Sequence, residues 1–361
     1  MSLTQALLEK YQAICPYYSS YPPLGEWKEE FSPGAFEDAL SRFCSEASPD
    51  EPNTYALYVH YPYCVKLCHF CICNLRVTGD KALKLRALKN ISDEIGYFRR
   101  FMDSHPHRPV CREIHLGGGT PSYMDNEDFD RLIADIESLV DISSVDEFAM
   151  EIDPRTVTPE SIGYYATKGI NRISFGIQDF NPRVQEAVNR VQPIEHVRAL
   201  LSPKIRSIYK SVNFDILYGL PLQTRDTFRE TIDRVKEFMP DRITLIRYAH
   251  VPNIKKHMKL LNEDDIISEK EKILMFMETT KSLLNAGYEH VGIDNFALPT
   301  DSLGKAFRNK TVWRNFSGFT PGRVKNMIGV GPSATSIFSG VYSQNIYDIS
   351  EYYLAVERGQ C

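Results

Sequence analysis

An alternation of short apolar segments with amphipathic segments restricts the fold of this sequence more than any other feature. After Asn53 the alternation repeats about six times. The predicted strands are Tyr55–Tyr61, Glu113–Leu116, Glu147–Ile152, Arg172–Gly176, Val212–Tyr218, Arg242–Arg247 and His290–Ile293. The predicted helices are Ala82–Phe101, Glu127–Val140, Thr158–Thr167, Pro182–Asn189, Thr227–Phe238 and Ser268–Ala286. The pattern indicates parallel strands joined by crossover helices, and thus an α/β fold built as a barrel or as an open part of one.

The chain outside this repeat has a different character. We expect a helix over Leu3–Tyr11, an irregular aromatic and proline-rich stretch over Cys15–Pro23, and a second helix over Pro33–Ser45. A chain of 361 residues is long for one ordinary domain. We therefore predict an N-terminal arm of residues 1–50, a barrel of residues 51–300 and a C-terminal segment of residues 301–361.

Composition excludes several classes of protein. Hydrophobic residues make up 43% of the chain and charged residues 25%, and the net charge is −5, as in ordinary globular proteins. No uncharged apolar run approaches the ~20 residues that a membrane helix needs. The first residues, MSLTQALLEKYQ, do not resemble a signal peptide. The acidic balance argues against a broad nucleic-acid surface, although a local basic groove is compatible with it. We expect a cytoplasmic monomer.

Four of the eight cysteines, Cys64, Cys68, Cys71 and Cys73, lie within ten residues directly after the first predicted strand. A disulfide framework usually spreads its cysteines along a short secreted chain, so this group indicates a metal site in a reducing compartment. Thiolates are soft ligands that suit zinc or an iron–sulfur cluster.

The spacing C-x3-C-x2-C leaves two metals to consider. A structural zinc ion would need a fourth ligand, and the sequence has no second C-x-x-C, although His60 or His69 could supply it. Three cysteines would instead leave one iron of a cubane cluster open, and an open metal position usually serves chemistry.

Other polar or glycine-rich segments also follow predicted strands, where the chemistry of such barrels collects. These segments are Gly117–Thr120, Glu151–Pro154, Gln178–Asp179 and Tyr248–His250. The glycines allow a close approach of backbone to a ligand, or simply form a tight turn. They do not form a phosphate loop, because no Gly-Lys-Ser/Thr follows them. Taken singly, the polar residues could equally be structural hydrogen-bonding groups.

The three-cysteine motif with Phe70 before its last cysteine resembles the radical S-adenosylmethionine (radical SAM) superfamily. The resemblance implies that Cys64, Cys68 and Cys71 hold a 4Fe–4S cluster whose open iron binds SAM, which is then cleaved to a 5′-deoxyadenosyl radical. It also implies a partial (β/α)6-type radical SAM barrel, here with an N-terminal helical and extended arm and a shortened C-terminal region that begins a helical domain.

Further motifs resemble one branch of that superfamily, the oxygen-independent coproporphyrinogen III oxidases, also called coproporphyrinogen dehydrogenases. The motifs are Tyr58–Cys64, Gly117–Ser122, Glu151–Arg155, Gly176–Asn181, Asp215–Pro221 and Tyr248–His250, and the likeness extends from about residue 16 to the C-terminus. The resemblance implies contacts to a first SAM from Tyr58, Phe70, Gly118, Gly119, Thr120, Glu151 and Thr335. It implies contacts to a second SAM from Gln178, Arg190, Asp215 and Ala249. Tyr58 and Cys73 are the implied catalytic residues, and Cys73 would be a thiol that does not bind the cluster.

The resemblance also implies a reaction, in which two propionates of a reduced tetrapyrrole become vinyl groups in haem biosynthesis. Coproporphyrinogen III would thereby yield protoporphyrinogen IX, with a flavodoxin or ferredoxin as electron donor. Candidates for binding the propionates are Arg155, Arg190, Arg247 and Arg314. The alternatives are another radical SAM reaction, such as methyl transfer, cyclopropanation or anaerobic haem ring opening, and a haem carrier without catalysis.

Overall fold

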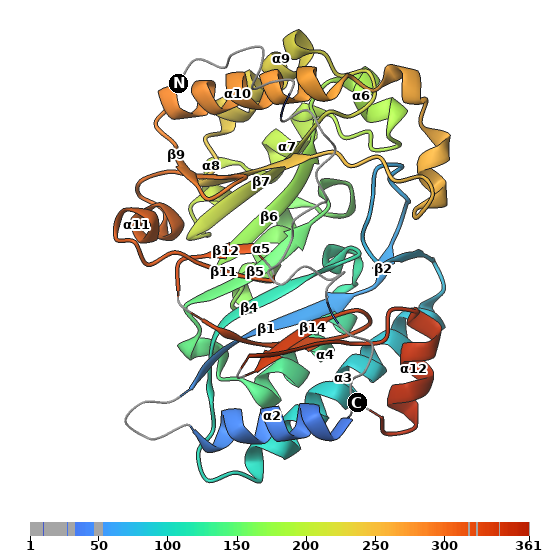
Figure 1. Ribbon diagram of the computed structural model, residues 1–361, viewed down its shortest axis with the longest axis vertical. Helices are drawn as coiled ribbons and strands as arrows, with labels where there is room; N and C mark the ends of the chain where they lie inside the picture. The colour runs from blue at the N-terminus through green and yellow to red at the C-terminus, as the bar shows by residue number, and fades with distance from the viewer. Residues whose placement is uncertain are drawn as a thin grey trace.

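A computed structural model of the chain describes residues 10, 27, 33–46, 53–316, 318–322, 324–338 and 340–360 (Figure 1). Apart from Lys10, the predicted helix Leu3–Tyr11 and the aromatic stretch Cys15–Pro23 lie outside the described residues. The predicted helix Pro33–Ser45 is present as α2 with the same bounds.

A twisted sheet of eleven strands forms the centre of the described structure, in the order β15-β14-β13-β1-β4-β5-β6-β7-β8-β10-β9. The strands from β1 to β8 in this order run parallel. They are β1 Thr54–Tyr61, β4 Val110–Gly118, β5 Glu147–Ile152, β6 Arg172–Gln178, β7 Ser211–Tyr218 and β8 Arg242–Arg247. The two edge strands β15 and β9 do not pair, so the sheet is an open part of a barrel, as the sequence predicts.

Helices cover the outside of the sheet, and all but the last of them connect parallel strands. They are α3 Lys81–Asp103, α4 Asn126–Leu139, α5 Pro159–Thr167, α6 Pro182–Ala187, α7 Ile194–Leu200, α8 Pro203–Arg206, α9 Arg225–Phe238 and α10 Glu269–Asn285. Figure 1 shows α2 and α3 at one end of the molecule and α9 and α10 at the other. The sequence predicts all of these helices except the short α7 and α8.

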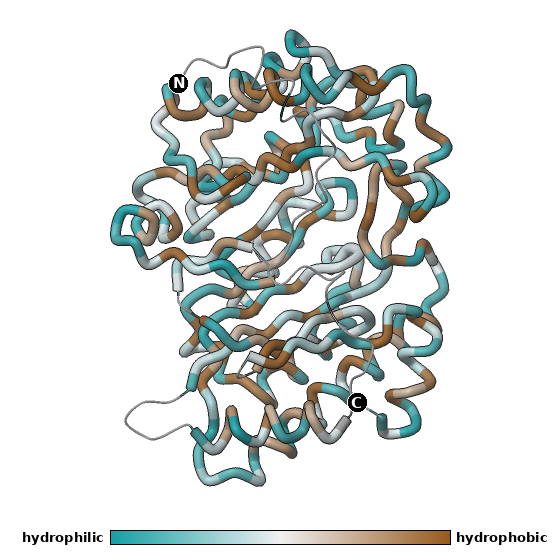
Figure 2. The backbone as a smooth tube through the Cα atoms, viewed as in Figure 1, coloured by the Kyte–Doolittle hydropathy of each residue, from teal (hydrophilic) through white to brown (hydrophobic). Residues whose placement is uncertain are grey.

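Local sequence explains where several helices begin. The Asp80 side chain accepts a hydrogen bond from the Ala82 N–H at the start of α3, and Thr158 and Thr224 form reciprocal caps at the starts of α5 and α9. The strands between these helices are largely buried; in β7, for example, every residue except Asp215 is buried. Hydrophobic and hydrophilic residues accordingly alternate along the outer helices in Figure 2.

Short strands extend both edges of the parallel core. β13 Asn326–Val330 lies parallel to β1, and β14 Thr335–Phe338 and β15 Val341–Gln344 continue that edge in antiparallel pairing. β10 Asn295–Ala297 and β9 Glu289–Val291 form the other edge, also antiparallel. The sequence predicts β9 near His290–Ile293 but none of the other strands in this set.

The C-terminal segment contributes mostly strands where the sequence predicts the start of a helical domain. Its described elements are α11 Ser302–Arg308, β11 Trp313–Asn315, β12 Gly318–Thr320, β13, β14, β15 and α12 Ile349–Glu357. β11 and β12 form a separate antiparallel hairpin. Because β13 pairs with β1, this segment belongs to the same sheet as the barrel strands. The division of the chain at residues 50 and 300 stays a prediction.

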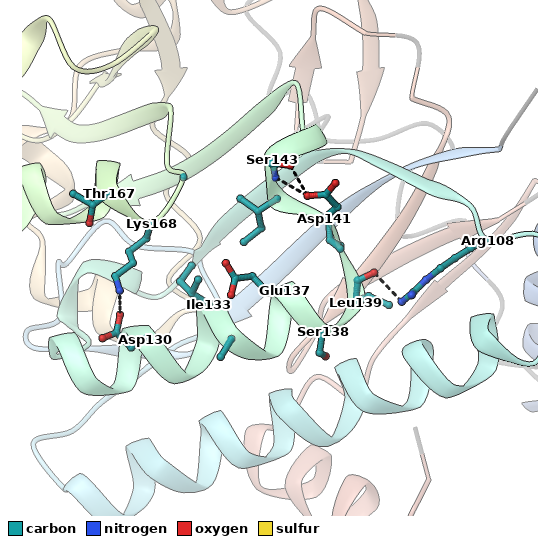
Figure 3. A pocket seen from close by; sticks show the side chains of 14 residues that line it. Arg108, Asp130, Ile133, Glu137, Ser138, Leu139, Asp141, Ser143, Thr167 and Lys168 are labelled. Atoms are coloured by element: carbon teal, nitrogen blue, oxygen red, sulfur yellow. Dashed lines mark hydrogen bonds and ion pairs between the residues drawn. The ribbon is translucent and has the colours of Figure 1, made fainter.

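A broad hollow of about 950 Å³ lies at the amino ends of β5 and β6, beside the ends of α4 and α5 (Figure 3). Its two basic side chains have local partners: Lys168 pairs with Asp130 at 2.6 Å, and Arg108 donates to the Leu139 carbonyl at 2.9 Å. Most of the predicted site residues lie at the opposite, carboxyl ends of the strands. No described helix is long and apolar enough to cross a membrane.

Candidate active site

The cysteine motif lies on a closed loop that follows β1. The loop leaves through β2 Tyr63–Cys64 and returns through β3 Arg76–Val77, which pairs with β2 in parallel. The Arg76 N–H donates to the Pro62 carbonyl at 2.8 Å, and the Cys71 N–H donates to the Cys68 carbonyl at 3.1 Å. These bonds hold the predicted cluster ligands Cys64, Cys68 and Cys71 in one compact segment.

Side chains from distant parts of the chain fix this loop. Asn189 donates to the Leu67 carbonyl at 2.8 Å, and Lys255 donates to the Cys73 carbonyl at 3.0 Å. The His257 ring bonds the Cys71 carbonyl at 2.8 Å. Since backbone carbonyls are the acceptors, these contacts set the path of the loop and leave its sulfur atoms available.

The two histidines that could complete a zinc site are engaged with other groups. His60 Nε2 lies 2.8 Å from the Asn74 carbonyl oxygen and His60 Nδ1 lies 3.1 Å from the Tyr58 hydroxyl, so both ring nitrogens are used. His69 Nδ1 lies 3.3 Å from the Ala187 carbonyl oxygen. Across the described ranges, no three Cys, His, Asp or Glu side chains are grouped as a site for a single metal ion.

A cavity of about 150 Å³ brings most of the predicted site residues together at the carboxyl end of the sheet. Its lining includes Cys64, Cys68, Phe70, Cys71, Cys73, Gly118, Gly119, Thr120, Glu151, Gln178, Arg190 and Asp215. A second cavity of about 450 Å³ adjoins it, shares Phe70, Cys71, Cys73, Glu151, Gln178 and Asp215 with it, and also contacts Ala249. The structure thus shows that these residues lie together, whereas the role of each residue stays a prediction.

Two guanidinium groups lie against the Cys68 sulfur. Arg155 and Arg190 each place a terminal nitrogen 3.3 Å from Cys68 Sγ, and both also contact Asp153 Oδ2, at 2.7 and 3.2 Å. Burial acts to raise the pKa of Asp153, but the two arginines outweigh it and hold that pKa at about 2. The group therefore has one net positive charge beside the sulfur.

The other thiols differ in their electrostatic surroundings. Cys64 lies 3.0 Å from the Thr120 hydroxyl, and burial raises the pKa of its thiol to about 12. The Cys73 thiol donates a hydrogen bond to Cys71, which lowers the pKa of Cys71 to about 7. The same contact raises the pKa of Cys73. A metal that binds Cys64 must therefore displace its proton.

The glycines at the end of β4 pack against the start of the cysteine loop. The Gly119 N–H donates to the Tyr61 carbonyl at 2.7 Å, and a Cβ at Gly119 would lie 2.8 Å from the Tyr63 backbone. Gly118 has a φ of +105°, and a Cβ there would lie 2.8 Å from the His60 ring. The structure thus gives these glycines a packing reason, while their predicted contact with SAM stays a prediction.

Polar side chains line the interior faces of neighbouring strands. His115 Nε2 lies 3.0 Å from Glu151 Oε1. Asp215 accepts hydrogen bonds from Ser174 at 2.9 Å and from Asn213 at 2.8 Å, and burial raises its pKa. His115, Ser174 and Asn213 were not predicted as site residues. Their signal in the sequence is a polar residue at an alternating position inside an otherwise apolar strand.

Gln178 adopts an unusual conformation at the end of β6. Its φ of +66° lies in the left-handed region, and the pairing of β6 with β7 is irregular between Gly176 and Gln178. Its amide oxygen is buried and accepts no hydrogen bond from the described residues. Because an unsatisfied buried acceptor is costly, this oxygen fits a bound molecule with an N–H or O–H group.

Two predicted site residues lie apart from both cavities. Tyr58 lies within β1, where its hydroxyl contacts His60 and its ring stacks on His115 at 5.8 Å, so it supports the loop through His60. Thr335 begins β14 and is fully buried, with its backbone packed on Gly329. It lines neither cavity, because β13 separates β14 from β1.

Comparison with known proteins agrees with this arrangement. The sequence model of the Radical SAM superfamily matches residues 58–235. The chain is 35% identical over 356 residues to oxygen-independent coproporphyrinogen III oxidase from Pseudomonas aeruginosa, with 98% of this chain and 76% of the relative covered. It is 37% identical to the protein of the same name from Salmonella typhimurium, with 98% and 75% covered. The chain belongs to the oxygen-independent coproporphyrinogen III oxidase family.

A solved structure supports the fold of this family member. It is coproporphyrinogen III oxidase from Escherichia coli, described as a radical SAM enzyme, and it aligns with a TM-score of 0.89 at 34% identity. The alignment covers 99% of this chain and 79% of that one. Membership of the radical SAM superfamily implies a 4Fe–4S cluster and SAM as cofactors.

The residues present fit these two groups. The three thiols of the motif lie on one loop and line one cavity, two guanidinium groups lie 3.3 Å from the Cys68 sulfur, and Gln178 offers an unsatisfied amide oxygen in the same cavity. Thiolate ligands are those that iron–sulfur clusters require.

Proposed function

We propose that this protein converts coproporphyrinogen III to protoporphyrinogen IX without oxygen, by oxidative decarboxylation of two propionates. The observation that carries the proposal is the junction of the two cavities, because the cysteine loop and the strand ends line both. A substrate in the larger cavity would therefore lie beside the cofactors held in the smaller one.

The cysteine loop would hold the cluster through Cys64, Cys68 and Cys71. When bound, the cluster and SAM supply the one-electron chemistry that removes a hydrogen atom from the substrate. Gly118, Gly119, Thr120 and Glu151 would orient SAM at the ends of β4 and β5, with Phe70 covering it. Thr335 is a weaker candidate, because it lines neither cavity.

The number of SAM molecules is a further part of the proposal. Gln178 and Asp215 lie on the border of both cavities, and Ala249 lines the larger one. We propose that these residues bind a second SAM. Arg190, also predicted for this role, contacts Cys68 and Asp153, so we assign it to the charge balance of the cysteine loop.

The reaction balances for each propionate. One hydrogen atom leaves the carbon attached to the ring and ends in 5′-deoxyadenosine, CO2 then leaves, and a vinyl group remains. The one electron released with CO2 equals the one electron that the cleavage of one SAM to methionine consumes. The chain has three tasks in this reaction: to hold the ring, to orient one propionate toward SAM, and to exclude water from a reactive intermediate. Apolar side chains suit the first and third tasks, and Ile72, Leu217, Ile246, Phe316 and Phe319 line the larger cavity.

Cys73 would act as a catalytic thiol that does not bind the cluster. It lies on the same loop, is exposed, and hydrogen-bonds Cys71. Its position on the border of both cavities supports a role in proton or hydrogen transfer near the substrate.

We propose a cytoplasmic monomer that receives electrons from a flavodoxin or a ferredoxin. Free cysteines at positions 44, 64, 68, 71, 73 and 111 suit a reducing compartment.

Product analysis under strict anoxia tests the proposal. The reconstituted protein is incubated with SAM, a low-potential reductant and coproporphyrinogen III, and the tetrapyrroles are analysed by mass spectrometry. We expect protoporphyrinogen IX, CO2 and 5′-deoxyadenosine, all absent with the Cys68→Ala variant. Formation of 5′-deoxyadenosine with intact coproporphyrinogen would indicate another radical SAM reaction. Tight tetrapyrrole binding with neither product would indicate a carrier.

A further inference from the structure

Four arginines line the larger cavity, but they differ in what they contact. Arg172 and Arg242 both bond Glu147, at 2.7 and 2.8 Å, and Arg242 also bonds Asp301 at 2.7 Å. The Arg242 side chain is only 3% exposed. These two guanidinium groups belong to a buried ion network at the amino ends of β5, β6 and β8, where their charge is already balanced.

Arg314 has a different setting on the hairpin of β11 and β12. Its guanidinium lies 5.0 Å from the centre of the Phe319 ring, in a cation–π contact that places it in the wall of the cavity.

Arg247 is the arginine placed nearest to the mouth of the strands. It is the last residue of β8, directly before the Tyr248–His250 motif, and its side chain lines the cavity and is 34% exposed. Its guanidinium pairs with Glu269, the first residue of α10. An arginine at this strand end can reach a ligand without crossing the buried network below it.

The partner of Arg247 has a second cation. Glu269 Oε1 lies 2.9 Å from Lys272 Nζ, one turn further along α10. Lys272 is fixed in place, because its stem packs on Gly219 after β7; a Cβ at Gly219 would lie 2.8 Å from Lys272 Cε. Arg247, Glu269 and Lys272 together carry one net positive charge, so Glu269 keeps a cation when Arg247 turns to another anion.

We propose that Arg247 binds a propionate carboxylate of the tetrapyrrole, and that Glu269 then stays paired with Lys272. This inference rests on the proposed function. Exchange of one carboxylate for another at a guanidinium preserves its paired hydrogen bonds and leaves no buried charge alone. Since the cavity extends from Arg247 to Cys71 and Cys73, a propionate held at β8 would orient the opposite side of the ring toward the cysteine loop.

Equilibrium binding of coproporphyrin III tests this assignment. This oxidised, fluorescent tetrapyrrole is titrated without SAM into the 361-residue protein and into its variants Arg247→Gln, Arg247→Lys and Glu269→Gln. Arg183→Gln, a change of an exposed arginine on α6, is the control. A charge-assisted hydrogen bond contributes about 1.5–3 kcal/mol, so Arg247→Gln should weaken binding about 10- to 150-fold. The coproporphyrin affinity of Arg247→Lys should lie between those of the wild type and Arg247→Gln. Glu269→Gln should bind coproporphyrin more tightly than the wild type, and the control variant should bind it as the wild type does.

Two further titrations identify the carboxylate. A neutral amide derivative of coproporphyrin III should bind wild type and Arg247→Gln equally, and SAM should bind both equally. Loss of SAM affinity alone would show that Arg247 binds the carboxylate of SAM and would overturn the proposal. Equal coproporphyrin affinity of Arg247→Gln and wild type would overturn it as well. Failure of the wild type itself to bind coproporphyrin would instead refute the proposed function on which the inference rests.

Discussion

Glu94 couples three distant parts of the chain through one buried carboxyl group. It lies on α3 with 2% of its surface exposed. Its oxygens accept hydrogen bonds from the Gly331 N–H at 2.8 Å, the Asn345 amide at 2.6 Å and the Tyr352 hydroxyl at 2.6 Å. Gly331 in turn packs on the backbone of His60, where a Cβ would lie 2.4 Å from the carbonyl oxygen. The carboxyl group therefore helps to fix the end of β1, from which the cysteine loop departs.

The effect of pH on stability follows from the pKa of this group. Burial raises the pKa of Glu94 from 4.5 to about 7, against the hydrogen bonds that favour its charged form. The folded state therefore binds the proton more tightly than the unfolded state does. The contribution of the protonated Glu94 carboxyl to the free energy of unfolding is fully present below about pH 4.5 and is lost as the pH rises through about 7. The shift corresponds to about 3.4 kcal/mol, of which about 2.5 kcal/mol is lost between pH 5 and pH 8.

The substitution Glu94→Gln removes the titration while keeping the shape of the side chain. Urea unfolding of the metal-free protein, followed at pH 5 and pH 8, should show the wild type losing about 2.5 kcal/mol more than the variant over this interval. Glu230→Gln, a change of an exposed carboxylate on α9, should behave as the wild type. Tyr352→Phe removes one donor and should extend the decline to higher pH. Parallel pH profiles for wild type and Glu94→Gln would refute this reasoning.

Three further predictions concern the site itself. Asp153→Asn leaves two buried guanidinium groups without their carboxylate and should lower the free energy of unfolding by about 3–5 kcal/mol in urea titrations, whereas the same change at the exposed Asp233 should have little effect. An effect of equal size at both positions would contradict the assigned charge balance. Cys73→Ser should keep the iron content of the protein and abolish tetrapyrrole turnover; loss of iron would show that Cys73 binds the cluster. Gly119→Ala should lower both iron content and turnover, because the new Cβ would lie 2.8 Å from backbone of the cysteine loop, while Gly79→Ala, where no atom lies within 4 Å, should change neither.

The parallel core could be predicted from the sequence because its signals are local. The parallel strands β1, β4, β5, β6, β7 and β8 are apolar or mostly apolar runs, and the helices between them carry their own caps, such as Thr158 and Thr224. The cysteine loop was predictable for a similar reason, since the spacing of Cys64, Cys68 and Cys71 places three soft ligands on one segment.

The remaining strands depend on contacts that no local pattern encodes. β13 pairs with β1 across more than 260 residues, as Tyr55 with Asn326, and the glycine-rich stretch around Gly329 and Gly331 does not have the composition of a strand. β10 has only three residues, and its position is set by its pairing with β8.

The partners of the charged side chains could not be predicted from the sequence either. Arg155 and Arg190 were candidates for binding propionates, yet both contact Cys68 and Asp153. The sequence does not show these contacts, because they depend on which strand ends lie next to the cysteine loop. Arg247 and Arg314 line the larger cavity, and the binding of propionates by any of the four candidate arginines stays a prediction.

The central claim is that the thiols of Cys64, Cys68 and Cys71 hold a 4Fe–4S cluster to which SAM binds. Electron paramagnetic resonance of the reduced, reconstituted protein, with iron counted in the same samples, tests it most directly. The account predicts about four irons per chain and a cluster signal that changes when SAM is added, in wild type and in Cys73→Ser alike. Alanine at any one of the three cluster positions should abolish that change. A protein that binds zinc in place of iron, or a signal indifferent to SAM and to these three substitutions, would contradict the account.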